Sequence, residues 1–353
     1  MGKVILDCEL MKTRDSGLYY YCLNLGMAMN ELLKNDGDQP VKFYVPSQEA
    51  NTFKDPTNTI VEKPFHKFFK PFLLNCKVWH RPFQLGRIIP ANKKDVKILL
   101  TVHDLNMLHQ DVPAKETEEA INNTRQLIQR SDAIVCVSEF SKNDVLQHCD
   151  VGNKPVYVIH NGVNRLEAPM LLPTSYKPSR PFLLSIGFVN PKKNLHSLLR
   201  LLKFNQDIEL VIAGRLDDLD YVKKMKEEAN QNGFEERLTI LGPVKESEKS
   251  WYLENCLAYM HPSFAEGFGL PVVEAMHFGK PLFLSNLTSL PEIGGDVAFY
   301  FTNFESHHMQ EVFTKGMQRY HQNAMSGQIK ERSNKFGWQE SAEKYIEVYQ
   351  SLF

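Results

Sequence analysis

The sequence predicts an α/β protein made of two domains, each built around a parallel sheet. In both halves, short apolar runs, each long enough for one buried strand, alternate with longer segments of helical periodicity. Between the halves, about twenty residues lose this periodicity and carry four prolines, which is typical of a linker. The length of 353 residues also fits two domains better than one.

The composition narrows the class of protein. Apolar residues make up 42% of the chain and charged residues 24%, which is usual for a globular protein. The net charge of −1 does not predict a nucleic-acid partner. The sequence contains no run of 18 apolar residues and therefore predicts no membrane helix. Its first residues resemble a strand rather than a signal peptide. The six cysteines are scattered, so we expect reduced thiols in a cytoplasmic protein and no metal site.

The first half opens with a strand over 3–7, a polar turn that ends at Gly17, and a helix over 20–33. This order is typical of a nucleotide-binding α/β half. The single glycine falls short of Gly-x-Gly-x-x-Gly, so the pattern disfavours a dinucleotide-dependent oxidoreductase. A second strand is expected at 41–45, where it ends before Pro46.

Three more strands are expected in the first half, at 97–102, 133–137 and 156–159. His103 directly follows the first of these strands. In an open α/β sheet, ligands bind at the carboxyl ends of the strands, so His103 is a candidate site residue. The alternative is that it caps a loop. A helix over 115–130 precedes the second strand, and Ser138 is expected to cap another helix after it.

Residues 63–94 have an unusual composition. Aromatic and basic side chains interleave there at helical spacing, namely Phe65, Phe68, Phe69 and Phe72 with Lys63, His66, Lys67 and Lys70. We expect the aromatic rings to pack against the sheet while the lysines are solvated. The alternative is a short amphipathic helix, limited by Pro64 and Pro71 to about two turns, that contacts an anionic membrane surface.

The second half repeats the alternation of strands and helices. The expected elements are strands at 182–186, 208–213, 238–241, 257–260 and 281–284, and helices at 217–231 and 246–254. Gly187 and Lys193 follow the first of these strands, and Arg215 follows the second. Two cationic side chains are therefore expected at neighbouring positions on one edge of the sheet.

The segment 263–276 predicts a glycine-containing loop that leads from a strand into a helix. Pro271 is expected to begin the helix and Gly279 to end it, with Glu266 in the loop and Glu274 on the first turn. A helix start suits a phosphate, and a carboxylate can accept hydrogen bonds from two sugar hydroxyls. The alternative is one solvated acid that complements the helix dipole. Two cations and two acids at one sheet edge together predict a ligand site.

The last segment predicts an amphipathic helix, because apolar side chains recur from 338 to 352 at helical spacing. Its position after a finished domain suggests that it returns to the first domain. The expected organisation is a domain over 1–165, a linker over 166–181, a domain over 182–335 and a bridging helix over 336–353.

These motifs resemble glycosyltransferase family 4, a large group of retaining enzymes with the GT-B fold. The similarity is carried by Glu266-x7-Glu274 within Ser-Phe-Ala-Glu-Gly-Phe-Gly-Leu-Pro-Val-Val-Glu-Ala-Met, and by shorter motifs along most of the chain, including His160-Asn-Gly-Val and Gly187 to Asn194. The resemblance implies two Rossmann-like domains that face each other across a cleft. A nucleotide-sugar donor would bind the C-terminal domain and the acceptor would meet the N-terminal one.

The resemblance also implies a role for each matching residue. Glu274 would bind the ribose, Glu266 would lie beside the transferred sugar, Lys193 would neutralise the diphosphate, His103 would lie beside the donor sugar, and Gly17 would let the first loop approach the phosphates. The other residues implied in donor binding are Gly187, Gly267, Phe268, Gly269 and Leu270. The resemblance implies no metal ion and no cofactor.

The chain departs from the family pattern at two places. Phe188 stands where many members carry an arginine, and we assign the missing positive charge to Arg215. Ser16-Gly17 replaces the usual pair of glycines in the first loop, which weakens the expectation of a phosphate contact there.

The expected function is retaining transfer of a hexose from a nucleotide sugar to a saccharide or lipid-linked acceptor. The Gly-x3-Pro-Lys-Lys-Asn form of the lysine loop is similar to mannosyl- and related hexosyltransferases of bacterial surface-polysaccharide assembly, so GDP-mannose is the first expected donor and a UDP-hexose the next. The expected location is the cytoplasm, with peripheral contact to the inner membrane surface as an alternative. The alternative functions are those of a sugar phosphorylase or epimerase on the same fold and of a catalytically silent binding subunit.

Overall fold

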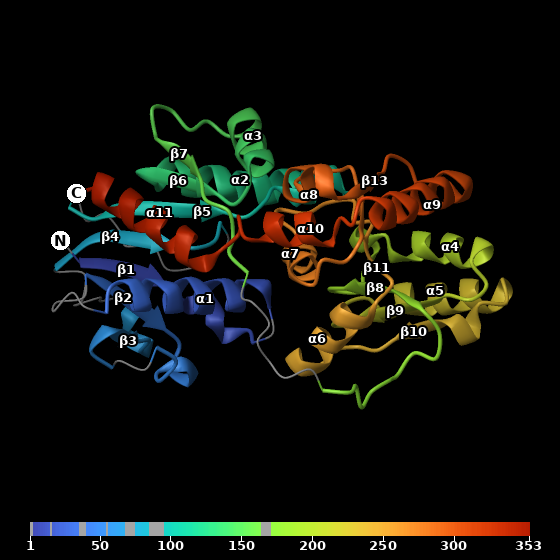
Figure 1. The fold of residues 1–353 in the computed structure, drawn as a ribbon. Helices are drawn as coiled ribbons and strands as arrows, with labels where there is room; N and C mark the ends of the chain where they lie inside the picture. The colour runs from blue at the N-terminus through green and yellow to red at the C-terminus, as the bar shows by residue number, and fades with distance from the viewer. Residues whose placement is uncertain are drawn as a thin grey trace. The chain divides into compact units, whose positions relative to one another are not determined.

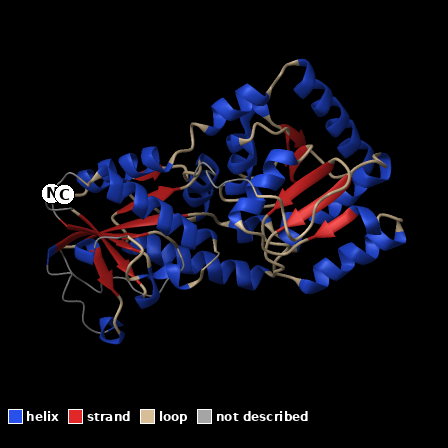
Figure 2. Ribbon diagram, turned by 60° about the horizontal axis from the view of Figure 1, so that its bottom comes forward, coloured by secondary structure: helices blue, strands red, loops and turns tan. Residues whose placement is uncertain are grey.

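The computed structural model describes residues 3–14, 16–34, 40–53, 56–67, 75–84, 95–163 and 171–353. The chain divides into two compact units: unit 1 contains residues 1–164 and 336–353, and unit 2 contains residues 165–335. Each unit has one parallel sheet with helices on both faces (Figures 1 and 2). The predicted fold class, two parallel-sheet domains of the Rossmann-like kind, is confirmed.

Unit 1 contains a seven-stranded sheet in the order β3-β2-β1-β4-β5-β6-β7. Its strands are β1 Lys3–Asp7, β2 Val41–Val45, β3 Thr59–Val61, β4 Cys76–Arg81, β5 Lys97–Val102, β6 Ala133–Cys136 and β7 Val156–Val158. Its helices are α1 Gly17–Leu32, α2 Ala114–Arg130, α3 Glu139–His148 and α11 Trp338–Ser351. Alternate residues of each strand point to opposite faces, so both faces of the sheet are apolar and each is covered by helices.

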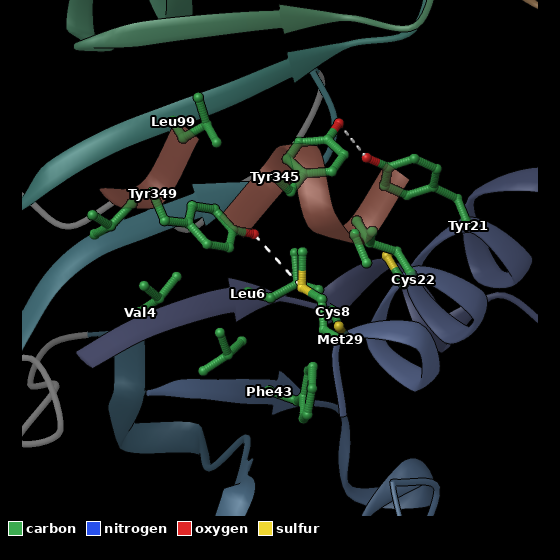
Figure 3. Packing of buried hydrophobic residues seen from close by; sticks show 14 of the residues in the cluster. Val4, Leu6, Cys8, Tyr21, Cys22, Met29, Phe43, Leu99, Tyr345 and Tyr349 are labelled. Carbon is green, nitrogen blue, oxygen red and sulfur yellow. Dashed lines mark hydrogen bonds between the residues drawn. The ribbon is translucent and has the colours of Figure 1, made fainter. Parts of the chain in front are cut away.

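The terminal helix α11 packs beside α1 on one face of the unit 1 sheet (Figures 1 and 3). It adds five buried side chains to that core: Trp338, Ala342, Tyr345, Val348 and Tyr349. Helices α2 and α3 pack on the opposite face.

A chain of buried polar groups ties α11 to the sheet. The Tyr345 hydroxyl lies 2.7 Å from that of Tyr21 (Figure 3) and 3.0 Å from Thr101 Oγ1. The His80 ring continues the chain, with Nε2 2.8 Å from Thr101 Oγ1 and Nδ1 2.7 Å from the Tyr349 hydroxyl. Burial lowers the pKa of His80 to about 3, so the ring is neutral. Each polar group therefore has a partner inside an otherwise apolar core.

Strands β3 and β4 were not expected from the sequence. In β4, the charged or polar side chains of Lys77, His80 and Arg81 interrupt the apolar pattern, although the strand lies at the centre of the sheet. The aromatic rings around 65–72 were expected to pack against the sheet, with a short amphipathic helix as the alternative. A short 3-10 helix spans Pro64–Lys67, Phe65 is 48% exposed and His66 is buried against Tyr44, while residues 68–72 lie outside the described residues.

Unit 2 contains a six-stranded sheet in the order β10-β9-β8-β11-β12-β13. Its strands are β8 Phe182–Ile186, β9 Glu209–Ala213, β10 Leu238–Ile240, β11 Ala258–His261, β12 Leu282–Ser285 and β13 Phe299–Phe301. Its helices are α4 Leu199–Phe204, α5 Leu219–Gln231, α6 Glu246–Asn255, α7 Leu270–His277, α8 Leu290–Gly294, α9 Ser306–Gln322 and α10 Ser326–Ser333. The sequence did not predict β13, α9 or α10.

The strand order reverses direction once in each sheet. From β8, the chain adds β9 and β10 on one side of the sheet and then β11, β12 and β13 on the other side. The reversal therefore lies between β8 and β11. In unit 1 it lies between β1 and β4. A crevice opens at the carboxyl ends of the strands at such a point, where ligands of open α/β sheets bind. No helix in the described part of the chain is long and apolar enough to cross a membrane.

Candidate functional site

The strand reversal of unit 2 is flanked by two of the predicted site residues. Lys193 lies in the loop after β8, and Glu266 lies in the loop after β11. Their side chains form an ion pair between Lys193 Nζ and Glu266 Oε1, and both side chains are nearly buried, with 13% and 11% exposed. Both charges lie at one edge of the sheet, as the sequence predicted, and the structure adds that they pair directly.

The loop after β8 leaves room for the Lys193 ammonium. Gly187 has a φ of +146°, a conformation that favours glycine, and a Cβ there would lie 3.8 Å from Lys193 Nζ. Gly214, at the end of β9, has a φ of +143°, and a Cβ at this position would come within 2.0 Å of the Gly187 carbonyl oxygen. The close approach of the two loops therefore depends on glycine at both strand ends.

Asn194 joins the lysine loop to the glutamate loop. It has a φ of +52° and is buried, and its Nδ2 donates to the carbonyl oxygen of Pro262 at 3.2 Å. Asparagine is one of the few residues that adopt this conformation readily. The backbone N–H of Phe264 also donates to the Lys192 carbonyl oxygen at 2.9 Å. These contacts fix the separation between Lys193 and Glu266.

His261, the last residue of β11, is the third member of this cluster. Its Nε2 lies 2.7 Å from Glu266 Oε1, and its Nδ1 lies 3.2 Å from the Tyr259 hydroxyl. Burial lowers the pKa of His261, although the neighbouring Glu266 acts in the opposite direction. The imidazole is therefore neutral at neutral pH and donates to the carboxylate without adding charge.

Glu266 is ionised in spite of its burial. Burial by itself would raise the pKa of its carboxyl, but the ammonium of Lys193 and the hydrogen bond from His261 lower it well below its ordinary value. The backbone of Glu266 is held as well: its N–H donates to Thr288 Oγ1 at 3.0 Å, and Ser289 Oγ donates to its carbonyl oxygen at 2.9 Å. The site thus holds a fixed anion beside a cation.

Arg215 lies beside Phe188. Its guanidinium carbon is 4.2 Å from the centroid of the Phe188 ring, and its Nη2 donates to Asp217 Oδ1 at 2.7 Å. The side chain is 47% exposed. The positive charge of Arg215 therefore stands over the ring of Phe188, from the end of the neighbouring strand.

Glu274 lies one residue further along its helix than expected. Helix α7 begins at Leu270 rather than Pro271, so Glu274 is in the second turn. One carboxylate oxygen, Oε1, accepts a hydrogen bond from Lys249 Nζ on α6 at 2.9 Å. Lys249 also pairs with Glu246 at 3.0 Å, and its side chain is only 13% exposed. The two glutamates of the motif are thus each held by a different lysine.

The glycine-containing loop between the glutamates is mostly buried. Gly269 has a φ of +97° and precedes helix α7, and the Phe268 side chain is 4% exposed. Gly267 is buried and Leu270 is half-buried.

His103 and Gly17 belong to unit 1. His103 is half-buried, with Nε2 2.8 Å from the Pro82 carbonyl oxygen and its ring in a T-shaped contact with Tyr21. Burial lowers the pKa of His103, so this ring is also neutral. Gly17 is the first residue of α1, exposed, and Ser16 before it caps the helix by accepting from the Tyr19 N–H. The described conformation of Gly17 does not require glycine.

Models of two known protein families match the chain. The model of the family described as "Glycosyl transferases group 1" matches residues 174–321, and that of "Glycosyltransferase Family 4" matches residues 42–165. The two matches fall in different units and together cover most of the chain. The chain belongs to the glycosyltransferases that these two models describe.

Relatives with curated descriptions agree with this assignment. The chain is 24% identical over 283 residues to the serotype-specific mannosyltransferase WbdA of Escherichia coli, covering 75% of this chain and 34% of WbdA. This chain thus spans about a third of that relative's length. An uncharacterized glycosyltransferase of Methanocaldococcus jannaschii is 25% identical, with 97% of this chain and 99% of that protein covered. The chain is thus similar in sequence to mannosyltransferases and to other glycosyltransferases.

Solved structures support the fold. HepE of Anabaena, in complex with UDP-glucose, has a TM-score of 0.74 at 16% identity and covers 99% of this chain and 100% of HepE. Sucrose-phosphate synthase of Thermosynechococcus elongatus has a TM-score of 0.73 at 15% identity, with 100% of this chain and 99% of that chain covered. The chain therefore has the GT-B fold.

Sequence reasoning missed three residues of the site: His261, Lys249 and Thr288. His261 directly follows an apolar strand, the same signal that singled out His103, and could have been found by it. Lys249 sits among acidic residues of a surface helix, and nothing in its spacing points to Glu274. In the described part of the chain, no group of three His, Cys, Asp or Glu side chains is arranged to hold a metal ion.

Proposed function

We propose that this glycosyltransferase transfers a hexose, with retention of anomeric configuration, from a nucleotide sugar to a saccharide or lipid-linked acceptor. GDP-mannose is the first candidate donor and a UDP-hexose the second. The names of the relatives favour mannose, and the solved HepE complex with UDP-glucose is the reason to retain UDP-hexoses. The proposal includes no metal ion and no cofactor.

The observation that carries this proposal is the ion pair of Lys193 and Glu266 over the strand reversal of unit 2. Cleavage of the bond between the sugar C1 and the diphosphate leaves negative charge on the phosphate and positive charge on the sugar. A preorganised cation beside a preorganised anion suits both charges, and such electrostatic stabilisation is often the largest part of catalysis. Lys193 would face the diphosphate and Glu266 the sugar.

The remaining residues would complete the donor site. Arg215 would add a second positive charge for the diphosphate, together with the backbone N–H groups of Gly267, Phe268 and Gly269 near the start of α7. Glu274 would accept hydrogen bonds from the ribose. His103, in unit 1, would lie beside the donor sugar. The acceptor oxygen would form the new bond to C1 while its proton passes to the leaving phosphate oxygen.

A thermal-shift screen with GDP, UDP and ADP tests the donor part of the proposal. A nucleotide at 100 times its dissociation constant adds about 2.7 kcal/mol of stability, so the preferred base will give the largest rise in Tm. Arg215→Met should reduce this rise, and Lys203→Ala, which removes an exposed charge from α4 in the same unit, should not. Equal behaviour of all three nucleotides and of the buffer control would contradict the proposal.

Release of nucleotide from GDP-mannose or UDP-glucose, measured with and without a mannose-containing oligosaccharide, tests the reaction. Transfer requires the acceptor, a phosphorylase would require inorganic phosphate, and a silent subunit would bind nucleotide without release. NMR of the product assigns the anomeric configuration. A product of inverted configuration would exclude the retaining mechanism.

Peripheral contact with a membrane is the alternative for the aromatic segment around residues 65–72. The observation that favours it is the exposed ring of Phe65. Liposome flotation should then require anionic lipid and weaken with salt. Absence of flotation with anionic vesicles would leave the rings assigned to packing.

A further inference from the structure

We propose that His261 is a positioning residue for the transfer reaction. It holds one oxygen of Glu266 so that the other oxygen faces the donor sugar, and it keeps this carboxylate in place when Lys193 turns to the diphosphate. The inference rests on the proposed function, and it adds a role to a residue that the function did not require.

The hydrogen bonds of the Glu266 carboxylate are asymmetric. Oε1 is the acceptor for both Lys193 Nζ and His261 Nε2. Among the residues that the structure describes, none is recorded as a partner of Oε2. A carboxylate has two oxygens that each accept hydrogen bonds, so one side of Glu266 is used by the protein and the other is available to sugar hydroxyls.

The partners of the imidazole assign its tautomer. A carboxylate only accepts hydrogen bonds, so the proton lies on Nε2, and Nδ1 is then an acceptor. The hydroxyl that can donate to Nδ1 is that of Tyr259, at 3.2 Å, and its single proton has the Ile186 carbonyl oxygen, at 3.3 Å, as the competing acceptor. Tyr259 and His261 are two residues apart on β11, so they share a face of the sheet, and their rings stack at 21°.

The position of the imidazole is rigid. His261 is 1% exposed, and it is part of a strand that is buried along its whole length. Lys193, in contrast, reaches Glu266 from a loop through a long flexible side chain. Of the two donors to Oε1, the imidazole is the one that cannot move away.

Binding of the donor would affect the Lys193 and His261 bonds to Glu266 differently. The diphosphate competes with Glu266 for the Lys193 ammonium, and a buried carboxylate left without any partner is strongly destabilised. The neutral imidazole remains as a partner, so Glu266 can stay ionised and in position while the sugar–phosphate bond breaks. His261 acts on the sugar through Glu266 and does not touch the reacting atoms.

Steady-state kinetics with GDP-mannose, beside calorimetry with free GDP, test this role in the intact protein. His261→Leu should lower kcat about ten- to a hundredfold, because a hydrogen bond to a charged group is lost, and should leave the Kd for GDP nearly unchanged. His261→Gln places an N–H at a similar reach and should restore most of the activity. His196→Leu is the matched control, since His196 also bonds a tyrosine hydroxyl, that of Tyr221, without contacting a carboxylate.

Nitrogen NMR of the His261 ring gives a second measurement that does not depend on turnover. A signal for the Nε2–H tautomer, kept after GDP is added, is expected. Wild-type turnover in His261→Leu, equal losses of kcat and GDP affinity, or a ring that loses its bond to Glu266 when GDP binds would each overturn the role. A wild-type protein that releases nucleotide from neither GDP-mannose nor UDP-glucose would instead overturn the proposed function, and the NMR result would still decide the hydrogen bond.

Discussion

Both units place an acid and a base at the reversal of their strand order, but the pKa values of the two acids shift in opposite directions. In unit 1, Asp7 and Arg81 end the neighbouring strands β1 and β4 and are both buried. Burial there raises the pKa of Asp7 to about 7, and the attraction of Arg81 offsets only part of this rise. In unit 2, donors from Lys193 and His261 reach Glu266 directly, and they lower its pKa in spite of burial.

This difference shows that topology sets where charges meet, whereas direct hydrogen bonds set which charge state they adopt. The carboxylate of Asp7 accepts a hydrogen bond from the backbone N–H of Glu9 at 3.1 Å. The carboxylate of Glu266 accepts one from a charged group and one from an imidazole. A buried acid is ionised where such donors repay its desolvation. The following predictions test this contrast.

The largest effect is expected in unit 1, on stability. Because the pKa of Asp7 is raised from 3.8 to about 7, the folded state binds more protons than the unfolded state between these values. The free energy of unfolding therefore falls as pH rises through this window, by a total on the order of 4 kcal/mol from this residue. Asp7→Asn should remove this dependence.

Urea unfolding at pH 4 and pH 8 measures the Asp7 effect. Trp79 and Trp338 belong to unit 1 and Trp251 to unit 2, so a Trp251→Phe background makes fluorescence report on unit 1. The advantage of Asp7→Asn over wild type should grow with pH. A constant difference between the two proteins would show that Asp7 titrates normally.

The next largest effect is expected for Lys193→Ala in unit 2. Loss of a preorganised charge at the reacting centre typically lowers turnover about 10²–10³-fold. The far-ultraviolet circular dichroism should remain that of the wild type, because a loop-borne cation contributes little to packing. Turnover near that of wild type would show that the ion pair is structural. Lys203→Ala is the control.

The two glutamates of unit 2 should differ in their kinetic effects. Glu274→Gln should weaken GDP binding about ten- to a hundredfold, since the ribose does not change during the reaction. Glu266→Gln should leave GDP affinity almost unchanged and lower kcat, the pattern of an interaction made mainly in the transition state. Calorimetry and initial rates measure the two quantities. Equal loss of GDP affinity in both variants would refute this division of roles.

The smallest effect is expected for Arg215, because its side chain is half exposed and already paired with Asp217. Arg215→Met should lower kcat/KM about tenfold, and Arg215→Lys should recover part of the loss, since exposed charges contribute less than buried ones. Rates at low and high salt provide the measurement. An Arg215→Met variant that matches the wild type at low salt would remove Arg215 from the donor site.

Much of unit 2 could be predicted from its sequence because its strands are uninterrupted apolar runs. Strand β11, for instance, is buried along its whole length, as expected for a strand covered on both faces. The prediction failed for β4, where His80 and Arg81 are buried but find partners in distant elements, His80 in α11 and β5. Polar residues in a core are predictable only when their partners are known.

The site residues were predictable as individuals but their pairing was not. Lys193 and Glu266 were found from positions after strands, and their contact follows from β8 and β11 being adjacent, which the sequence does not state. The bond between Lys249 and Glu274 joins α6 to α7, and no pattern in either helix indicates it. Likewise, the tautomer of His261 depends on Tyr259 and Glu266 together.

The packing of α11 on unit 1 has a consequence for folding during translation. Translation delivers the sheet of unit 1 first, yet the side chains that complete its core, among them Trp338 and Tyr349, emerge only after all of unit 2. The fit is tight: a Cβ at Gly162 would come within 2.2 Å of the Trp338 backbone nitrogen. During synthesis, unit 1 therefore lacks α11 and has an uncovered apolar face, whereas unit 2 consists of one continuous stretch of chain. Unit 2 can fold during synthesis, whereas unit 1 reaches its final core only after residues 338–349 have left the exit tunnel.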